Sequence, residues 1–179
     1  FGLVEAFDPA TGETVWAQAP YQPTLLEAAG ISTRGIDRWQ QGIDRRLTEV
    51  RGNDLYALKP QTGDMIPDFE RDEPGGINPA YSAANANNFS LTTSPIVIGN
   101  TAVLGGFLNG AGDGGSRKEA APENIRGFDV RTGDLKWEFN VVPRPGEFGY
   151  DTWEEGSAEW SGDIGSRCCM SAAVELGLR

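Results

Sequence analysis

Residues 4–16 read VEAFDPATGETVW, and the same order of residue types returns as LYALKPQTGD at 55–64 and as IRGFDVRTGDLKW at 125–137. Each copy holds a small residue, then a large apolar one, then a Thr-Gly pair that begins four residues after the apolar position. Apolar residues alternate up to Phe7 and Phe128, as in a strand with one buried face. The unit therefore predicts a strand, a tight turn and a returning strand.

The residues of the turn explain why it should be tight. The carboxylates of Asp8 and Asp129 can accept hydrogen bonds from the backbone amides of the turn. Glycine takes the positive φ that a short hairpin loop with a bulge requires, and it stands at the same place in all three copies, Gly12, Gly63 and Gly133.

The returning strand should end in a large aromatic residue, Trp16 or Trp137. Such a ring can pack across its own sheet onto the next one and bury on the order of 200 Å². The middle copy departs from the pattern, because Lys59 replaces the aspartate and Pro67 stands at the tryptophan position.

The turn glycines are 51 and 70 residues apart. Propeller blades take about 40 to 50 residues each, so the spacings fit one blade and then one blade with an insertion. Residues 46–58 read as strand, turn and strand, and residues 94–105 as a hairpin around Gly99-Asn100. We predict an all-β fold, a partial β-propeller of four-stranded antiparallel blades, in preference to unrelated hairpins.

Composition restricts the function. The 179 residues carry a net charge of −11, which disfavours nucleic acid and anionic membranes as partners. The sequence has no histidine, the usual general base, and its two cysteines are adjacent, with no metal-binding spacing. No apolar run approaches the roughly 18 residues of a membrane span. The strand pattern at the first residues favours an origin inside a longer protein.

Taken with the repeats, five segments resemble the quinoprotein dehydrogenases, most closely the glucose, quinate and methanol type. The segments are residues 32–35 (STRG), 92–95 (TTSP), 126–133 (RGFDVRTG), 143–149 (PRPGEFG) and 151–154 (DTWE). The family's members are eight-bladed propellers that hold pyrroloquinoline quinone (PQQ) and a calcium-type cation on the central axis. The resemblance implies that residues 1–179 form one partial propeller domain, with roughly three to four blades.

The resemblance also implies a cofactor site. Arg34 matches an arginine that pairs with a quinone carboxylate, and Thr92 a threonine that contacts another carboxylate. Asp113, in a glycine-rich loop, is the candidate ligand of the Ca²⁺ ion. Each has a plainer interpretation: a surface arginine beside Arg38, an ordinary strand threonine, and a solvated turn aspartate.

The match fails near the C-terminal end. Arg167 stands where the family has the tryptophan that lies flat under PQQ, and Ala173 stands at an aspartate position. Loss of the aromatic floor should weaken cofactor binding by about 1–3 kcal/mol, although a guanidinium can itself stack. Arg167 thus remains a candidate cofactor contact. The pair Cys168-Cys169 does not match the vicinal disulfide of some family members. No residue matches the catalytic aspartate of the family.

Three functions remain open. The first is a fragment of a periplasmic PQQ-dependent dehydrogenase, which oxidises an alcohol or sugar by hydride transfer to a calcium-bound quinone. Its partners would be the rest of the propeller chain and an electron acceptor, a cytochrome or ubiquinone. The second is a non-catalytic binding or scaffold propeller, and the third an inactive gene fragment with exposed strand edges.

Overall fold

The computed structural model describes residues 4–18, 35–51, 54–69, 89–90, 93–105, 107–108, 123–162, 164–166 and 170–176. The strands are β1 (Glu5–Phe7), β2 (Thr14–Ala17), β3 (Ile36–Gln41), β4 (Asp44–Arg51), β5 (Asp54–Leu58), β6 (Phe89–Ser90), β7 (Ile96–Ile98), β8 (Thr101–Leu104), β9 (Phe107–Leu108), β10 (Ile125–Asp129) and β11 (Leu135–Phe139). All pairings between these strands are antiparallel. The predicted all-β class is confirmed.

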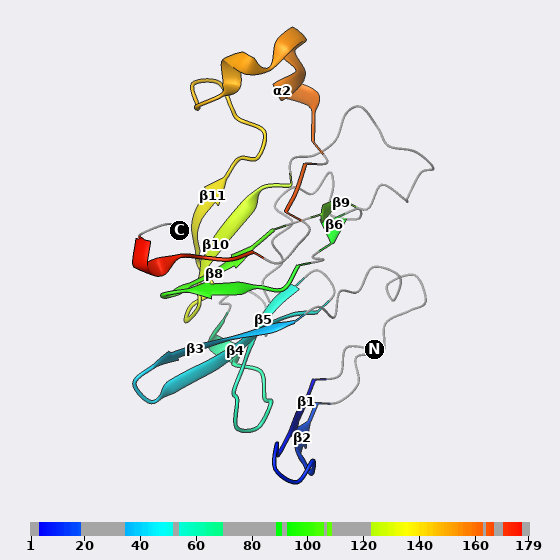
Figure 1. Ribbon diagram of the computed structural model, residues 1–179, viewed down its shortest axis with the longest axis vertical. Coiled ribbons are helices and arrows are strands. Elements are labelled where there is room, and N and C mark those ends of the chain that lie inside the picture. Colours follow the sequence, from blue (N-terminus) through cyan, green and yellow to red (C-terminus); the bar gives the residue numbers. More distant parts are fainter. Residues whose placement is uncertain are drawn as a thin grey trace, which may run out of the picture.

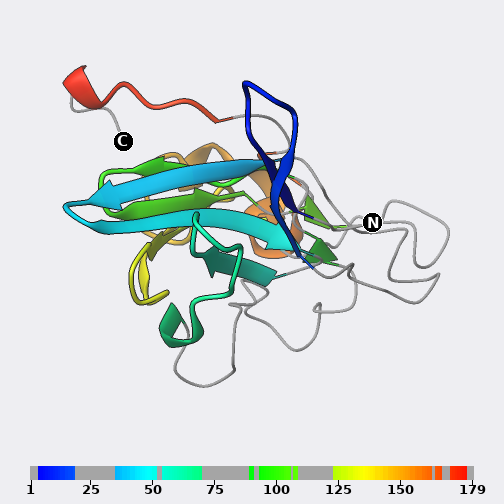
Figure 2. The same cartoon turned by 90° about the horizontal axis from the view of Figure 1, so that it is seen from below.

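The described strands form four sheets. One has the order β11-β10-β8-β7, one has β3-β4-β5, and the pairs β1-β2 and β6-β9 make two small ribbons. Figure 1 shows the first three as a row, with the β1-β2 hairpin next to the three-stranded sheet and the four-stranded sheet on its other side. Seen from below in Figure 2, the two larger sheets lie one over the other. This is the stacking of successive propeller blades.

The core lies between these two sheets. Val50, Leu55 and Ala57 from β4 and β5 join Ala102, Leu104 and Phe128 from β8 and β10 in one cluster of buried side chains. Phe69 closes this cluster from the short 3₁₀ turn η1 (Pro67–Phe69), and its side chain is fully buried. Burial of apolar surface on both facing sheets is the main force that holds them together.

The three predicted turns have the expected geometry. Gly12, Gly63 and Gly133 have φ values of 74°, 73° and 80°. The carboxylate of Asp8 accepts the amide of Ala10 at 2.7 Å, and that of Asp129 accepts the amide of Arg131 at 2.9 Å. The middle turn forms without an aspartate, because the Gly63 amide donates to the Lys59 carbonyl at 2.8 Å, as its counterparts do in the other turns.

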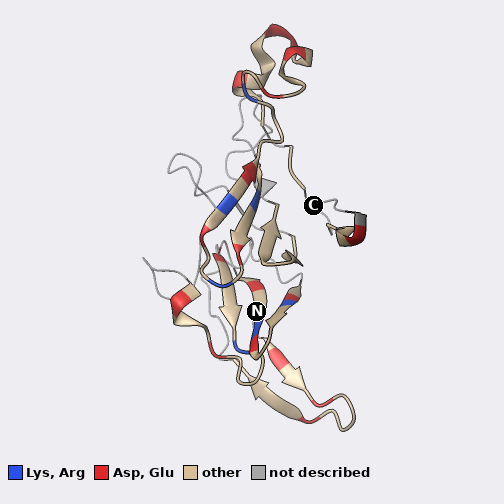
Figure 3. Ribbon diagram, turned by 90° about the vertical axis from the view of Figure 1, so that its left-hand side faces the viewer, with Lys and Arg blue, Asp and Glu red and all other residues tan. Residues whose placement is uncertain are grey.

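The remaining short helices are η4 (Tyr150–Thr152), η5 (Glu154–Gly156), α2 (Ser157–Trp160) and η6 (Val174–Leu176). Figure 3 shows acidic residues along the helical segment at one end of the molecule and at the hairpin turns. No helix within the described ranges has the length and apolar character needed to cross a bilayer.

Candidate functional site

The candidate site is the edge of the sheets at which β3 and β7 begin and β8 ends, and we call it the strand-start edge. Three segments that are distant in sequence meet there, just before β3, just before β7 and around residue 166. Gly35 packs against the side chain of Ser94 so closely that a Cβ atom on Gly35 would clash with it. The glycine is therefore required by the close approach of the two segments.

Gly105, at the end of β8, connects the segment before β7 with the segment around Ser166. The hydroxyl of Thr93, which is 3% exposed, donates to the Gly105 carbonyl at 3.0 Å. On the other side, a Cβ atom on Gly105 would lie 2.7 Å from the carbonyl oxygen of Ser166. A side chain at position 105 would push the segment around Ser166 away, so this glycine also permits a close backbone approach.

The four predicted cofactor and metal residues, Arg34, Thr92, Asp113 and Arg167, lie outside the described residues. Gly35, Thr93 and Ser166 are the direct chain neighbours of three of them, and these neighbours belong to the strand-start edge. The nearest described neighbours of Asp113 along the chain are Leu108 and Glu123. The convergence of the four side chains stays a prediction.

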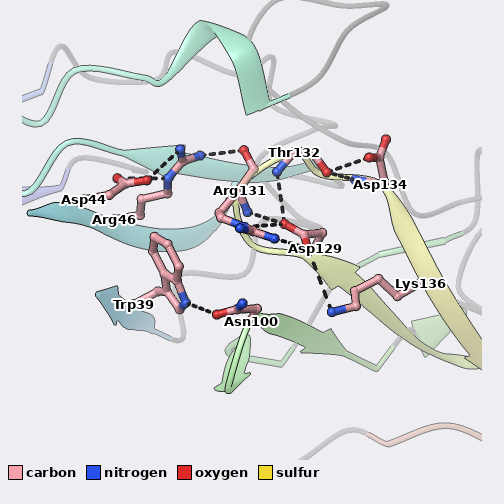
Figure 4. A network of polar contacts seen from close by, with 9 residues as sticks. All are labelled: Trp39, Asp44, Arg46, Asn100, Asp129, Arg131, Thr132, Asp134 and Lys136. Atoms are coloured by element: carbon pink, nitrogen blue, oxygen red, sulfur yellow. Dashed lines mark hydrogen bonds and ion pairs between the residues drawn. The ribbon is translucent and has the colours of Figure 1, made fainter. Parts of the chain in front are cut away.

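The opposite edge of the sheets carries a polar network that joins the two larger sheets (Figure 4). The Trp39 indole donates to Asn100 Oδ1 at 3.0 Å, and Arg46 Nη1 donates to the carbonyl of Arg131 at 2.6 Å. Asp44 orients Arg46 through two contacts of 3.1 and 3.3 Å. Sequence reasoning missed these inter-sheet contacts, since the partners lie 61 and 85 residues apart.

Asp129 takes part in the same network. Partial burial raises the pKa of Asp129, but the Arg131 and Thr132 amides and the Arg131 guanidinium lower it more, so that it lies below the ordinary value of 3.8. Lys136 adds a cation at 3.9 Å. The arrangement favours the charged form of the Asp129 carboxylate, which stabilises the turn.

A second polar chain runs along β10 and β11. Arg126 donates to Glu138 at 2.7 Å, Asn124 bridges Glu138 and Asn140, and Asn140 donates to Glu147 at 2.9 Å. The Arg144 amide and Asn140 lower the pKa of the Glu147 carboxyl. Glu147 therefore anchors the turn that follows β11.

The described residues contain no group of three or more His, Cys, Asp or Glu side chains that could hold a metal ion. Asp113 stays the sequence-based candidate for a ligand of the cation. The exposed residues Asp151, Glu154 and Glu155 lie on the helical segment.

Comparison with known proteins shows which family has this architecture. A model of the family "PQQ: Glucose/ethanol/alcohol dehydrogenase, beta-propeller domain" matches residues 1–178. The chain belongs to this PQQ propeller family. The family resemblance and the propeller fold predicted from the sequence are thus confirmed.

Individual members of the PQQ propeller family are distant. Quinoprotein glucose dehydrogenase A of Acinetobacter calcoaceticus is 27% identical over 155 residues, which cover 76% of this chain and 19% of that protein. The dehydrogenase subunit of a quinone-dependent alcohol dehydrogenase from Gluconacetobacter polyoxogenes is 24% identical over 148 residues, 81% of this chain and 18% of the relative. The chain thus spans about a fifth of the length of these relatives.

Solved structures agree on the fold. The quinohemoprotein alcohol dehydrogenase of Pseudomonas putida HK5 matches with a TM-score of 0.67 and 19% identity, over 97% of this chain and 24% of its own. A europium-containing methanol dehydrogenase matches with a TM-score of 0.51 and 16% identity, over 77% of this chain and 21% of its own. At these identities the likeness concerns the propeller architecture.

Proposed function

We propose that this chain is part of a PQQ-dependent dehydrogenase that oxidises an alcohol or a sugar, with the cofactor at the strand-start edge. The observation that carries the proposal is the contact chain from Gly35 to Ser94 and from Thr93 through Gly105 to Ser166. It brings the neighbours of Arg34, Thr92 and Arg167 to one edge of a propeller whose family is defined by PQQ.

The residues in question suit the cofactor. PQQ is a tricarboxylate, and the guanidinium groups of Arg34 and Arg167 can each bind a carboxylate through two hydrogen bonds, with the Thr92 hydroxyl as a further donor. Asp113 would supply an oxygen ligand to Ca²⁺. When bound, the quinone would accept hydride from the alcohol carbon, while the cation would act as a Lewis acid.

The described residues contribute a frame for that site. Thr93, the residue after Thr92 in the sequence, is held by its bond to Gly105. The close approach of Gly35 to Ser94 fixes the chain directly after Arg34. Binding groups on a rigid frame lose less conformational entropy when the ligand binds. The periplasm, and a cytochrome or ubiquinone as electron acceptor, belong to the same proposal.

One observation favours a second candidate, a binding or scaffold propeller without a quinone. By the sequence resemblance Arg167 stands at the position of the family's tryptophan, so a bound cofactor would meet an arginine in place of an aromatic ring. The two candidates differ in one measurable property, the affinity for PQQ.

The experiment is a titration of the chain with PQQ in the presence of Ca²⁺, followed by quenching of tryptophan fluorescence. The dehydrogenase proposal predicts saturable binding that Arg34→Ala weakens at least tenfold, because a paired carboxylate contact is worth about 1.5–3 kcal/mol. Arg38→Ala is the matched control, since Arg38 is an exposed arginine on β3, four residues further along the chain.

Equal loss in Arg34→Ala and Arg38→Ala would mean that the quinone is attracted by charge alone, and the assignment of Arg34 would be wrong. An Arg167→Trp variant tests the floor, and tighter binding by this variant is expected because stacking on an aromatic ring is worth about 1–3 kcal/mol. Absence of binding in both the wild type and Arg167→Trp would favour the scaffold candidate.

A further inference from the structure

The buried polar side chains of the described residues gather at the strand-start edge. Glu49 pairs with Ile36, the first residue of β3, and Arg126 pairs with Leu104, the last residue of β8. Burial of polar groups costs free energy unless they are hydrogen-bonded, so specific bonds hold this edge in addition to apolar packing. The buried polar residues are Thr48, Glu49, Thr93, Glu123, Asn124 and Arg126.

Asn124, which is 3% exposed, fastens the start of β10 to the end of β11 and the chain after it. Its Nδ2 donates to Glu138 Oε1 at 2.5 Å and to Asn140 Oδ1 at 2.9 Å. Its Oδ1 accepts the Val141 amide at 3.3 Å. An asparagine amide has two N–H donors and one carbonyl oxygen, and all three groups are used here. An aspartate could not make the two donor contacts.

The bonds of Asn124 belong to a larger cluster. Arg126 lies two residues further along β10, on the same face, and donates to Glu138 Oε2 at 2.7 Å. Asn140 donates to Glu147 at 2.9 Å, and Glu147 also accepts the Arg144 amide at 2.7 Å. These bonds join residues 124–147, so they do not depend on what precedes or follows the sequence. We call Asn124, Arg126, Glu138, Asn140 and Glu147 the β10-β11 polar cluster.

The cluster holds the beginning of a segment that ends at the candidate site. From Val141 the chain leaves the sheet, passes through η4, η5 and α2, and comes back to the strand-start edge at Ser166. Figure 1 shows the helical part of this segment beyond the end of β11. At Ser166 the fit is close, since a Cβ atom on Gly105 would lie 2.7 Å from its carbonyl oxygen. The segment therefore begins and ends at the same edge of the sheet.

We propose that Asn124 is a positioning residue for the cofactor site, an inference that rests on the proposed function. Asn124 fixes Asn140 and Val141, and these set the direction in which the segment leaves the sheet. The returning chain then meets Gly105 at Ser166, and Arg167, the candidate cofactor contact, is the next residue. Loss of Asn124 would shift the segment and so displace the group at position 167.

The test combines the titration with PQQ and Ca²⁺ with a double-mutant cycle. Asn124→Ala should weaken PQQ binding about tenfold, within the range that orienting residues behind metal ligands typically give. Gly105→Ala should weaken it too, because the methyl group pushes the chain at Ser166 away. The double variant should bind no more weakly than the weaker single variant, since the segment is already displaced.

Asn100→Ala is the matched control. The side chain of Asn100 also joins two elements, as the acceptor for the Trp39 indole at 3.0 Å, but it lies at the opposite edge of the sheets. This variant should keep the PQQ affinity within roughly twofold of wild type, and its effect should add to that of Gly105→Ala. Circular dichroism of each variant shows that affinities are compared between folded proteins.

A second measurement needs no quinone. Hydrogen exchange of residues 164–166, followed by mass spectrometry, should be faster in Asn124→Ala than in wild type, while exchange of β5 stays the same. Asn140→Ala removes only the link between Asn124 and Glu147. It gives the same test with a milder change if Asn124→Ala does not fold.

Unchanged exchange of residues 164–166 in a folded variant would overturn the positioning role. Equal losses of PQQ affinity in Asn124→Ala and Asn100→Ala would do so as well, and so would additive losses in Asn124→Ala and Gly105→Ala. A wild type that does not bind PQQ would instead contradict the proposed function. The exchange of residues 164–166 would then still decide whether Asn124 holds this segment in place.

Discussion

Trp16 and Pro60 are joined by a 2.9 Å hydrogen bond from the indole nitrogen of one sheet to the backbone carbonyl of the next. The bond spans 44 residues and links two hairpins that share one sequence pattern. Its acceptor belongs to a turn whose glycine lies directly under the indole ring. The first copy of the repeat therefore encodes both a hairpin and its contact with the next hairpin.

Gly63→Ala should lower the free energy of unfolding by more than the cost of placing an alanine at a positive φ. An alanine at this positive φ costs about 1 kcal/mol, and the methyl group would also overlap the Trp16 ring, which adds about 1–3 kcal/mol. The free energy of unfolding, measured by urea denaturation, checks the sum.

Gly12→Ala is the matched control for this prediction. Gly12 has the same φ within a degree but nothing within 4 Å of the added atom, so only the backbone cost of about 1 kcal/mol is expected. Equal losses in the two variants would show that the Trp16 contact adds nothing to the requirement for glycine.

Arg46 links the three-stranded sheet, which holds the middle hairpin, to the next hairpin, as Trp16 links the first hairpin to the middle one. Pro67 stands at the tryptophan position of the middle copy, and Arg46 Nη1 reaches the turn of the next hairpin at the Arg131 carbonyl. Its guanidinium lies 5.9 Å from the centroid of the Trp39 ring. Arg46→Ala should therefore cost about 1.5–3 kcal/mol, the range for a hydrogen bond from a charged donor.

The neighbouring Arg45 is exposed, and Arg45→Ala should change the free energy of unfolding by less than about 0.5 kcal/mol. Thermal or urea unfolding of the two variants side by side measures the difference. If Arg45→Ala proves the more damaging of the two, the contribution of Arg46 to the sheet interface is wrongly assigned.

The repeat explains why much of the fold could be predicted from the sequence. The three turns follow from local residue chemistry, and so do the strands on either side of them. Strand β3 was missed, because Asp37, Arg38 and Gln40 give it no apolar alternation. It is held by pairing with β4 and by bonds to the next sheet, such as the one that the Val97 amide donates to Asp37 Oδ2 at 2.6 Å. Partners 60 residues away leave no local signal.

The candidate site could be predicted only in part for a related reason. The resemblance pointed to Thr92, whereas the structure describes its neighbour Thr93, a buried threonine bonded to Gly105. The hydrogen bond of Thr93 forms because β8 ends just before Gly105. The hairpin pattern of residues 94–105 does not indicate that end. Gly105 does not belong to a turn that the sequence predicts. A glycine is needed there because the chain packs closely against Ser166.

Glu138→Gln should destabilise the four-stranded sheet. Glu138 is the acceptor for Arg126, whose side chain is 9% exposed, at 2.7 Å. Without the charge, a nearly buried guanidinium loses an ion-pair partner, which costs about 1–3 kcal/mol even though the amide oxygen can still accept a bond. Glu159→Gln, at an exposed position of α2, should stay within about 0.5 kcal/mol. A greater loss in Glu159→Gln than in Glu138→Gln, by urea denaturation, would contradict this ranking.

Asp129→Asn should destabilise the protein at neutral pH and lose this effect in acid. The pKa of Asp129 in the folded protein lies below its ordinary value of 3.8, so the ionised form stabilises the fold at pH values above that. As the pH falls from about 3.8 through the folded-state pKa, the carboxyl becomes protonated and this stabilisation is lost. Asparagine keeps an oxygen for the Arg131 amide but no charge, so a cost of about 1 kcal/mol at neutral pH is expected.

The measurement is the free energy of unfolding of wild type and Asp129→Asn at pH 7 and at several values below 3.8. The gap between the two proteins should narrow on acidification, since a protonated Asp129 and an asparagine present similar neutral groups to Arg131 and Lys136. Asp151→Asn, an exposed change in η4, should stay within about 0.5 kcal/mol of wild type at pH 7. A gap that is absent at pH 7, or that widens in acid, would mean that the turn amides and cations do not favour the ionised carboxylate.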